Sequence, residues 1–238
     1  MTTRAILLAA GRGTRLGALT AHMPKPLLEV GRKPIIVHII DGLIAAGVRE
    51  FAIVAGYLAE ELQAGLGNGS QSGVEIQYFR QQELNGTARA LALARKFAGS
   101  EPFFFGWGDI LVRPTNYRQA IRTARFADAA IAVNEVDDPW AGGAVYVDSG
   151  FRVTRMVEKP ARGTSTTPWN NAGFGVLGPE IWPLIDALEP SPRGEFELPQ
   201  AVAGLVALGL DVRAVPVEGP WFDIGTPENL AAARAAFA

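Results

Sequence analysis

An apolar run and a loop rich in glycine and arginine are joined in the segment Ala5-Ile6-Leu7-Leu8-Ala9-Ala10-Gly11-Arg12-Gly13-Thr14-Arg15-Leu16. A continuous apolar run that ends at glycine is typical of a strand buried on both faces of a sheet. The small residues that follow let backbone N–H groups approach anionic oxygens closely, and the two arginines add positive charge. The segment therefore predicts a buried first strand and an anion-binding loop. The plainer alternative is a strand-to-helix turn with solvated arginines.

Outward from this segment, strand and helix patterns alternate through the first half of the chain. Runs rich in β-forming residues predict strands at 51–55, 74–79 and 102–107, and helical spacing predicts helices at 34–47, 59–66 and 87–97. This β-α-β order implies a mostly parallel sheet with helices on both faces.

The pattern of predicted elements changes at about residue 135, where the second half of the chain begins. Alternating runs at 144–147 and 152–157 flank the tight turn Asp148-Ser149-Gly150, which predicts a β-hairpin. Further strands are expected at 173–177 and 211–217, and helices at 179–188, 196–208 and 227–237. We therefore predict one α/β domain over residues 1–238, with a doubly wound, mostly parallel sheet and a small β-rich insertion in the second half.

Composition excludes several classes of protein. The 22 Lys+Arg and 24 Asp+Glu give a net charge of −2, and 48% of the residues are hydrophobic against 19% charged. A chain of this composition folds around a core, and it lacks the basic excess of a nucleic-acid-binding protein. The absence of cysteine excludes disulfides, thiolate zinc sites and cysteine nucleophiles. No apolar run reaches the ~18 residues of a membrane span, so we expect a cytoplasmic protein without nucleic-acid or membrane partners.

Two common phosphate-binding motifs do not fit the first loop. A Walker loop needs G-x-x-x-x-G-K-[ST], and that string is absent. A dinucleotide fingerprint needs a third glycine where Leu16 stands, and an acid near the end of the second strand, which instead reads Val54-Ala55-Gly56-Tyr57. The sequence therefore weakens a nicotinamide dehydrogenase interpretation.

Motifs along nearly the whole chain resemble the sugar-1-phosphate nucleotidyltransferases, the family that makes nucleotide-sugars. They are L-A-A-G-x-G-T-R-L at 8–16, P-K-P-L at 24–27, Gln81 with Gly86-Thr87-Ala88, Gly108-Asp109, Glu158-Lys159-Pro160, Asn171-Ala172-Gly173 and Trp221-Phe222-Asp223-Ile224-Gly225-Thr226. Each motif is weak alone, but together they stand in the family's order. The resemblance implies a Rossmann-like nucleotidyltransferase fold, with an NTP-binding half at about 1–135 and a sugar-phosphate-binding half at about 136–238.

The resemblance also implies how the nucleoside triphosphate is bound. The expected nucleotide-binding residues are Leu8, Ala10, Gly11, Arg12, Gly13, Thr14, Gln81, Gly86 and Thr87. A glutamine amide matches the edge of a pyrimidine, so UTP or dTTP is the expected substrate. Gln82 stays open as an alternative to Gln81.

Two aspartates are expected to hold Mg²⁺. Asp109 follows the strand predicted at 102–107, and Asp223 follows an aromatic pair that indicates another strand end. Hard cations prefer oxygen ligands, so two carboxylates that converge on a triphosphate suit this ion.

The remaining expected residues serve the sugar phosphate and catalysis. The sugar-phosphate set implied by the resemblance is Gly143, Glu158, Lys159, Asn171, Gly173 and Glu195, and the catalytic set is Arg15, Lys25 and Lys159. The expected reaction joins an NTP and a sugar 1-phosphate into an NDP-sugar and pyrophosphate. A sugar phosphate already carries a nucleophilic oxygen, so no general base is required.

Alternatives remain open at this level. The chain could be a guanylyl- or cytidylyltransferase for mannose, heptose or glucose 1-phosphate, or a non-catalytic subunit that binds a nucleotide-sugar. The presence of both Asp109 and Asp223 argues against the regulatory subunit, because a sensor has no need of a metal pair. Homo-oligomerisation and the identity of the sugar stay undecided.

Overall fold

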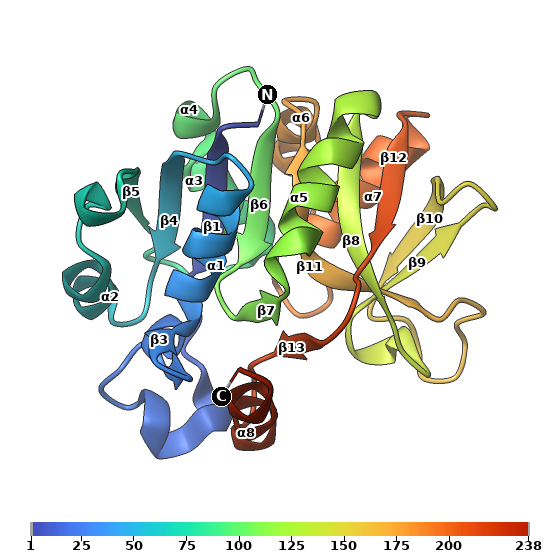
Figure 1. Ribbon diagram of the computed structural model, residues 1–238. Coiled ribbons are helices and arrows are strands. Elements are labelled where there is room, and N and C mark those ends of the chain that lie inside the picture. The colour runs from blue at the N-terminus through green and yellow to red at the C-terminus, as the bar shows by residue number, and fades with distance from the viewer. Residues whose placement is uncertain (1, 238) are drawn as a thin grey trace.

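The computed structural model describes residues 2–237, which form a nine-stranded sheet with helices on both faces (Figure 1). The strands are β1 (Arg4–Ala9), β2 (Glu29–Val30), β3 (Lys33–Pro34), β4 (Glu50–Ala55), β5 (Glu75–Arg80), β6 (Phe103–Trp107), β7 (Ile110–Val112), β8 (Ala129–Glu135), β9 (Gly143–Val147), β10 (Val153–Glu158), β11 (Trp169–Leu177), β12 (Val212–Pro216) and β13 (Trp221–Asp223). The helices are α1 (Ile35–Ala45), α2 (Ala59–Leu66), α3 (Thr87–Leu93), α4 (Arg95–Ala98), α5 (Pro114–Thr123), α6 (Ile181–Asp186), α7 (Leu198–Ala207) and α8 (Pro227–Ala236).

The expected buried first strand, β1, lies inside the sheet. It pairs in parallel with β4 and β6, and β4 pairs in parallel with β5. Its side chains alternate between the two hydrophobic cores: Leu7 packs with helices α1 and α5, and Ile6 packs with α3, α6 and α7. Figure 1 shows α1 and α5 in front of the sheet and α6 and α7 behind it. The doubly wound α/β class predicted from the sequence is confirmed.

The β-rich part of the second half extends the same sheet. Strand β11 runs antiparallel to β6. It also pairs with β8 and with β9 of the β9–β10 hairpin, so these strands continue the sheet. The hairpin forms around the predicted turn, where the side chain of Asp148 accepts hydrogen bonds from the backbone N–H groups of Gly150 and Arg152 at 2.9 Å each. An Asx-type turn of this kind is a local signal, which explains why the sequence predicted it.

The structure differs from the predicted elements in two main places. No element was predicted for the segments that form α5 and β8, although β8 is fully paired between β11 and β12. The helix expected at 87–97 is two helices, α3 and α4, because Ala94 leaves the helical region at φ −95° and ψ 11°.

No helix among residues 2–237 combines the length and apolarity needed to cross a membrane.

One small pairing outside the main sheet positions the aspartates. Strands β7 and β13 are antiparallel, with Asp223 opposite Ile110. The backbone N–H of Ile224 then donates to the carbonyl of Asp109 at 3.1 Å. Two segments far apart in the sequence therefore lie side by side near the carboxyl ends of the parallel strands, where open α/β sheets bind ligands (Figure 1).

Candidate active site

Two adjoining cavities open at this edge of the sheet. The first has a volume of about 230 Å³ and is lined mostly by residues before 110. The second, of about 450 Å³, is lined mostly by residues from 136 onward. Their shared walls are Thr87, Trp107, Asp109 and Glu195. The first cavity collects the predicted residues Leu8, Ala10, Gly11, Lys25, Gln81, Gly86, Thr87, Asp109 and Glu195. The second collects Arg15, Thr87, Asp109, Gly143, Glu158, Lys159, Asn171, Gly173, Glu195 and Asp223.

Charged side chains from four segments meet where the cavities join. The ammonium of Lys25 forms an ion pair with Oδ2 of Asp109, and these side chains are only 13% and 17% exposed. Burial raises the pKa of Asp223 above its usual value, and the neighbouring Asp109 raises it further, while Lys25 and Arg15 oppose the shift. The guanidinium of Arg15 also lies against Gly225, where a Cβ would come within 2.6 Å of Nη2. The structure thus brings together the two predicted metal ligands and two of the three predicted catalytic cations.

The two glycines of the first loop differ in how tightly they are packed. Gly13 has φ +64°, and a Cβ there would meet Thr20 and Lys25 at 3.2 and 3.3 Å. Gly11 faces open space, since a Cβ there would meet no atom within 4 Å, and it lines the first cavity. Thr14 begins a 3₁₀ turn that leads away from the loop.

Arg12 lies apart from the other predicted cations. Its guanidinium sits 5.6 Å from the centre of the Tyr57 ring, and it lines a third cavity of about 670 Å³. The structure therefore does not bring Arg12 to the Lys25–Asp109 pair. Its expected contact with a triphosphate stays a prediction.

The residues predicted to recognise the base, Gln81 and Gly86, contact each other next to the backbone of Phe196. Gln81 is 8% exposed, and its Nε2 donates to the carbonyl of Gly86 at 3.3 Å. This contact leaves Oε1 of Gln81 as the acceptor for a ligand. Gln82 is exposed and lines the third cavity but not the first, whereas Gln81 lines both. Gly86 has φ +118°, and a Cβ there would overlap the backbone of Phe196. The glycine is thus required by a contact within the protein.

Most residues predicted to bind the sugar phosphate lie on strands β9, β10 and β11 or directly after them. Glu158 lies opposite Gly143 on the paired strand, and a Cβ on this glycine would lie 3.3 Å from Oε2 of Glu158. Oδ1 of Asn171 accepts a hydrogen bond from the N–H of Gly173 at 3.2 Å. Lys159 has a left-handed backbone at φ 44°, held by a 2.8 Å hydrogen bond from its N–H to Gly142. Strained conformations of this kind are found where a side chain must be aimed.

The sequence interpretation missed two charged residues of this cavity, Arg193 and Glu197. Nη2 of Arg193 forms an ion pair with Glu197 and lies 3.6 Å from Glu195 and 3.9 Å from Glu158. Burial raises the pKa of Glu158 to about 7; Glu197 and Glu195 add to the shift, while Arg193 opposes it. Of the two acids in the segment Gly194–Leu198, the family resemblance had implied a role for Glu195 alone. The second acid of this segment, and the arginine just before it, were available signals.

Comparison with known proteins agrees with this geometry. Residues 4–238 match the family described as nucleotidyl transferase. The chain belongs to the nucleotidyl transferase family. The resemblance to sugar-1-phosphate nucleotidyltransferases drawn from the motifs is therefore confirmed.

Three similar proteins place the chain within this family. It is 35% identical to the UTP–glucose-1-phosphate uridylyltransferase AglF of Haloferax volcanii, over 95% of this chain and 93% of that protein. It is 33% identical to the glucose-1-phosphate thymidylyltransferase of Streptomyces griseus, over 95% of this chain and 64% of that protein. A Bacillus anthracis protein assigned as a glucose-1-phosphate thymidylyltransferase, crystallised with sucrose, superposes with a TM-score of 0.88 at 28% identity, covering 98% and 94% of the two chains. The chain thus spans less than two thirds of the length of several curated relatives.

Proposed function

We propose that the chain transfers a nucleotidyl group from a nucleoside triphosphate to a sugar 1-phosphate. The observation that carries this proposal is the meeting of Arg15, Lys25, Asp109 and Asp223 at the junction of two cavities. A phosphate oxygen of the sugar phosphate forms a bond to the α-phosphorus, the bond between the α-phosphorus and its bridging oxygen breaks, and pyrophosphate leaves. The nucleophile is already an anion, so no residue has to remove a proton from it.

The proposed roles follow from where each cation lies. Lys25 lines the first cavity beside Gly11 and is assigned to the α-phosphate. Arg15 and the backbone amides of the first loop are assigned to the leaving pyrophosphate. Lys159 lines the second cavity and is assigned to the sugar phosphate. Catalysis then consists of positioning two anions and neutralising the charge that shifts between them.

The residues at the junction fit a divalent cation, which we propose is Mg²⁺. No group of three His, Cys, Asp or Glu side chains within residues 2–237 forms a complete metal cage. Mg²⁺ is commonly held by one or two carboxylates together with substrate phosphates and water, and Asp109 and Asp223 supply such a pair. The raised pKa of Asp223 marks a place where additional positive charge is favourable. When bound, the ion would offset the negative charge of the phosphates.

We propose a pyrimidine nucleotide, UTP or dTTP, as the donor. Support comes from the acceptor Oε1 of Gln81, since N3 of uracil and thymine carries a hydrogen that this oxygen can accept. Cytosine has no hydrogen at N3, which disfavours CTP. A guanylyltransferase is the outcome to which the experiment below would point if GTP were preferred.

Two broader assignments are part of the proposal. The distribution of lining residues supports an NTP-binding half at about 1–135 and a sugar-phosphate-binding half at about 136–238, joined through shared walls. We also propose a cytoplasmic location, because the chain contains no cysteine to require an oxidising compartment.

Turnover of a substrate matrix tests the function. The purified chain is incubated with Mg²⁺, each of UTP, dTTP, CTP, GTP and ATP, and each of glucose, mannose, N-acetylglucosamine and galactose 1-phosphate. Pyrophosphate release is measured, and the nucleotide-sugar is identified by mass spectrometry. We expect release that depends on the sugar phosphate and is fastest with UTP or dTTP. Binding of a nucleotide-sugar without turnover of any pair would identify the chain as a regulatory subunit instead.

A further inference from the structure

A tight turn presents Arg193 to the second cavity. The N–H of Ser191 donates to the carbonyl of Glu195 at 2.9 Å, and the N–H of Gly194 donates to Ser191 at 2.7 Å. These bonds close the loop around Arg193, which lines the same cavity as Lys159 and Glu158. The arginine side chain is 42% exposed, so the turn alone does not fix its guanidinium.

The carboxylate of Glu197 holds the guanidinium of Arg193 in place. Its side chain is 6% exposed and forms an ion pair with Nη2 of Arg193, and the hydroxyl of Ser191 donates to its Oε1 at 3.4 Å. The backbone on either side is anchored to the nucleotide-binding segment. Phe196 exchanges hydrogen bonds with Asn85 and Ala88 at 2.8 and 2.9 Å, and the N–H of Leu198 donates to the hydroxyl of Thr87 at 2.9 Å.

Two other carboxylates compete for the same guanidinium. Glu195 and Glu158 lie 3.6 and 3.9 Å from Nη2 of Arg193. Glu197 is the most buried of the three carboxylates, because its side chain is 6% exposed against 14% for Glu158 and 44% for Glu195. A buried ion pair is by itself weak evidence for stability, because desolvation offsets much of the attraction. Its placement in the cavity wall calls for a functional reason.

We propose that Glu197 is a positioning residue. It holds Arg193 as a second cation beside Lys159, ready for the anionic phosphate of the sugar substrate, and it prevents Arg193 from approaching Glu158 more closely than the present 3.9 Å. This inference rests on the proposed function, because it assigns the second cavity to a sugar 1-phosphate.

A double-mutant cycle tests the proposal, using Glu197→Gln, Arg193→Ala and the pair together. Asp211→Asn is the matched control, since it removes the partner of another arginine, Arg213, at 2.8 Å outside the cavity. Glucose 1-phosphate and UTP are the probes, or the best pair from the substrate matrix. We expect Glu197→Gln to raise the KM for the sugar phosphate roughly tenfold, with the KM for the triphosphate and kcat changed less than about twofold. It should add nothing in the Arg193→Ala background, because its effect passes through that arginine.

The pH profile supplies a readout that a merely structural role would not move. Glu197 helps to raise the pKa of Glu158, and its loss also frees Arg193 to approach that carboxyl. Both effects lower the pKa, so the acid limb of kcat/KM for the sugar phosphate should shift to lower pH in Glu197→Gln. If this variant fails to fold, Glu197→Asp replaces it, with the same shifts expected at smaller size.

Three results would overturn the inference. They are an unchanged KM for the sugar phosphate in Glu197→Gln, an equal rise in both KM values, or effects of Glu197→Gln and Arg193→Ala that add independently. Failure of the proposed function looks different, because the unaltered chain would then make no nucleotide-sugar from any pair in the matrix.

Discussion

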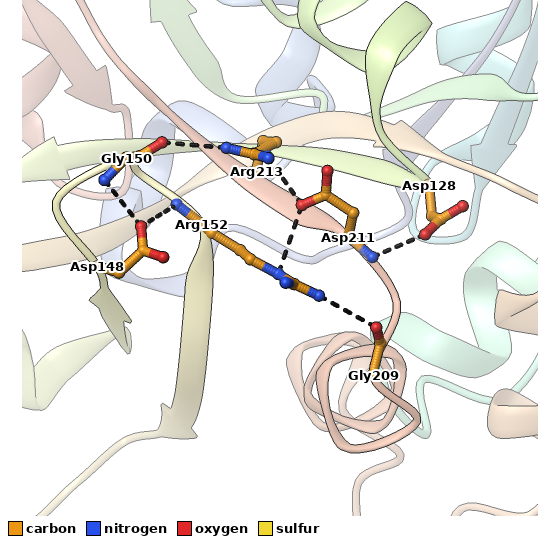
Figure 2. A network of polar contacts seen from close by, with 7 residues as sticks. All are labelled: Asp128, Asp148, Gly150, Arg152, Gly209, Asp211 and Arg213. Carbon is orange, nitrogen blue, oxygen red and sulfur yellow. Dashed lines mark hydrogen bonds and ion pairs between the residues drawn. The ribbon is translucent and has the colours of Figure 1, made fainter.

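Arginines and carboxylates gather in two regions of this molecule, with opposite electrostatic results. In the first, at the edge where the β9–β10 hairpin meets β12, the chain satisfies its own charges (Figure 2). Oδ1 of Asp148 accepts backbone hydrogen bonds from Arg152 and Gly150, and these bonds hold the pKa of Asp148 below its usual value. Asp211 pairs with Arg213 at 2.8 Å and with Arg152 at 3.5 Å.

In the second region, the joined cavities, the carboxylates remain poorly compensated. Burial and neighbouring acids raise the pKa of Glu158 to about 7 and raise the pKa of Asp223. The nearby cations, Arg193 beside Glu158 and Lys25 beside Asp223, only partly offset this. Carboxylates that a protein buries without full compensation mark functional sites, since a bound cation or polar ligand completes the interaction. The outer network pairs its own charges, whereas the cavity network is where we propose that ligands bind.

The largest expected effect comes from the aspartates at the cavity junction. Asp109→Asn and Asp223→Asn should each lower kcat about a thousandfold or more, because each removes a charge that we propose binds the metal and that would contribute several kcal/mol in the transition state. The melting temperature should change little. Initial rates of pyrophosphate release and a thermal melt measure the two quantities. Near-normal Mg²⁺-dependent turnover in either variant would remove that residue from the metal site.

The two cavity lysines should separate binding from catalysis. Lys159→Ala is expected to raise the KM for the sugar phosphate about tenfold or more, with a smaller change in the KM for the triphosphate. Lys25→Ala should instead lower kcat about a hundredfold, because its contact with the α-phosphate matters most as charge shifts in the transition state. Steady-state kinetics with both substrates varied will show the split. Equal effects of both variants on both substrates would contradict this division.

The free-energy cost of burying the Glu158 carboxylate can be measured as a change in the free energy of unfolding. Its pKa is raised in the folded protein, so the folded state holds the proton more tightly than the unfolded chain does. Stability therefore falls as pH rises from about 4.5 to about 7. Glu158→Gln should be more stable than the original chain by roughly 1–3 kcal/mol at pH 8, and equally stable near pH 4. Urea denaturation at both pH values is the measurement, and a destabilised variant at pH 8 would refute the raised pKa.

The smallest effect is expected in the outer network. Asp211→Asn removes a partly exposed ion pair, which is worth about 0.5–1 kcal/mol. Turnover and both KM values should match those of the original chain, because Asp211 lies outside both cavities. A change in kinetics as large as that of a cavity variant would break the distinction between the two regions.

The sequence was a good guide wherever the signal is local. The apolar run before Gly11 predicted β1, and the turn at Asp148 predicted the hairpin. The antiparallel pairing that seats Asp223 beside Ile110 depends on contacts between distant segments, so the sequence alone placed Asp109 and Asp223 together only through the family resemblance. Periodicity did not reveal α5 or β8.

The same limit explains what was missed in the site. The capture of Arg193 by Glu197 depends on a loop closed through Ser191, which no spacing rule describes. The packing of Gly86 against Phe196 is equally nonlocal: the sequence assigned that glycine to base recognition, and the structure adds a steric reason within the protein. Arg12 shows a different case, because its guanidinium lies 5.6 Å from the centre of the Tyr57 ring and the phosphate contact suggested by the loop motif stays a prediction.

The central claim is that Asp109 and Asp223 together bind a divalent cation with the triphosphate, at a place where burial and the neighbouring Asp109 raise the pKa of Asp223. Water-proton relaxation with Mn²⁺ and the preferred triphosphate measures this ternary complex directly, because the signal exceeds that of the metal–nucleotide complex alone. We predict a strong enhancement with the original chain and with Asp211→Asn, and its loss in Asp109→Asn and Asp223→Asn. An enhancement in Asp223→Asn equal to that of the original chain would contradict the account.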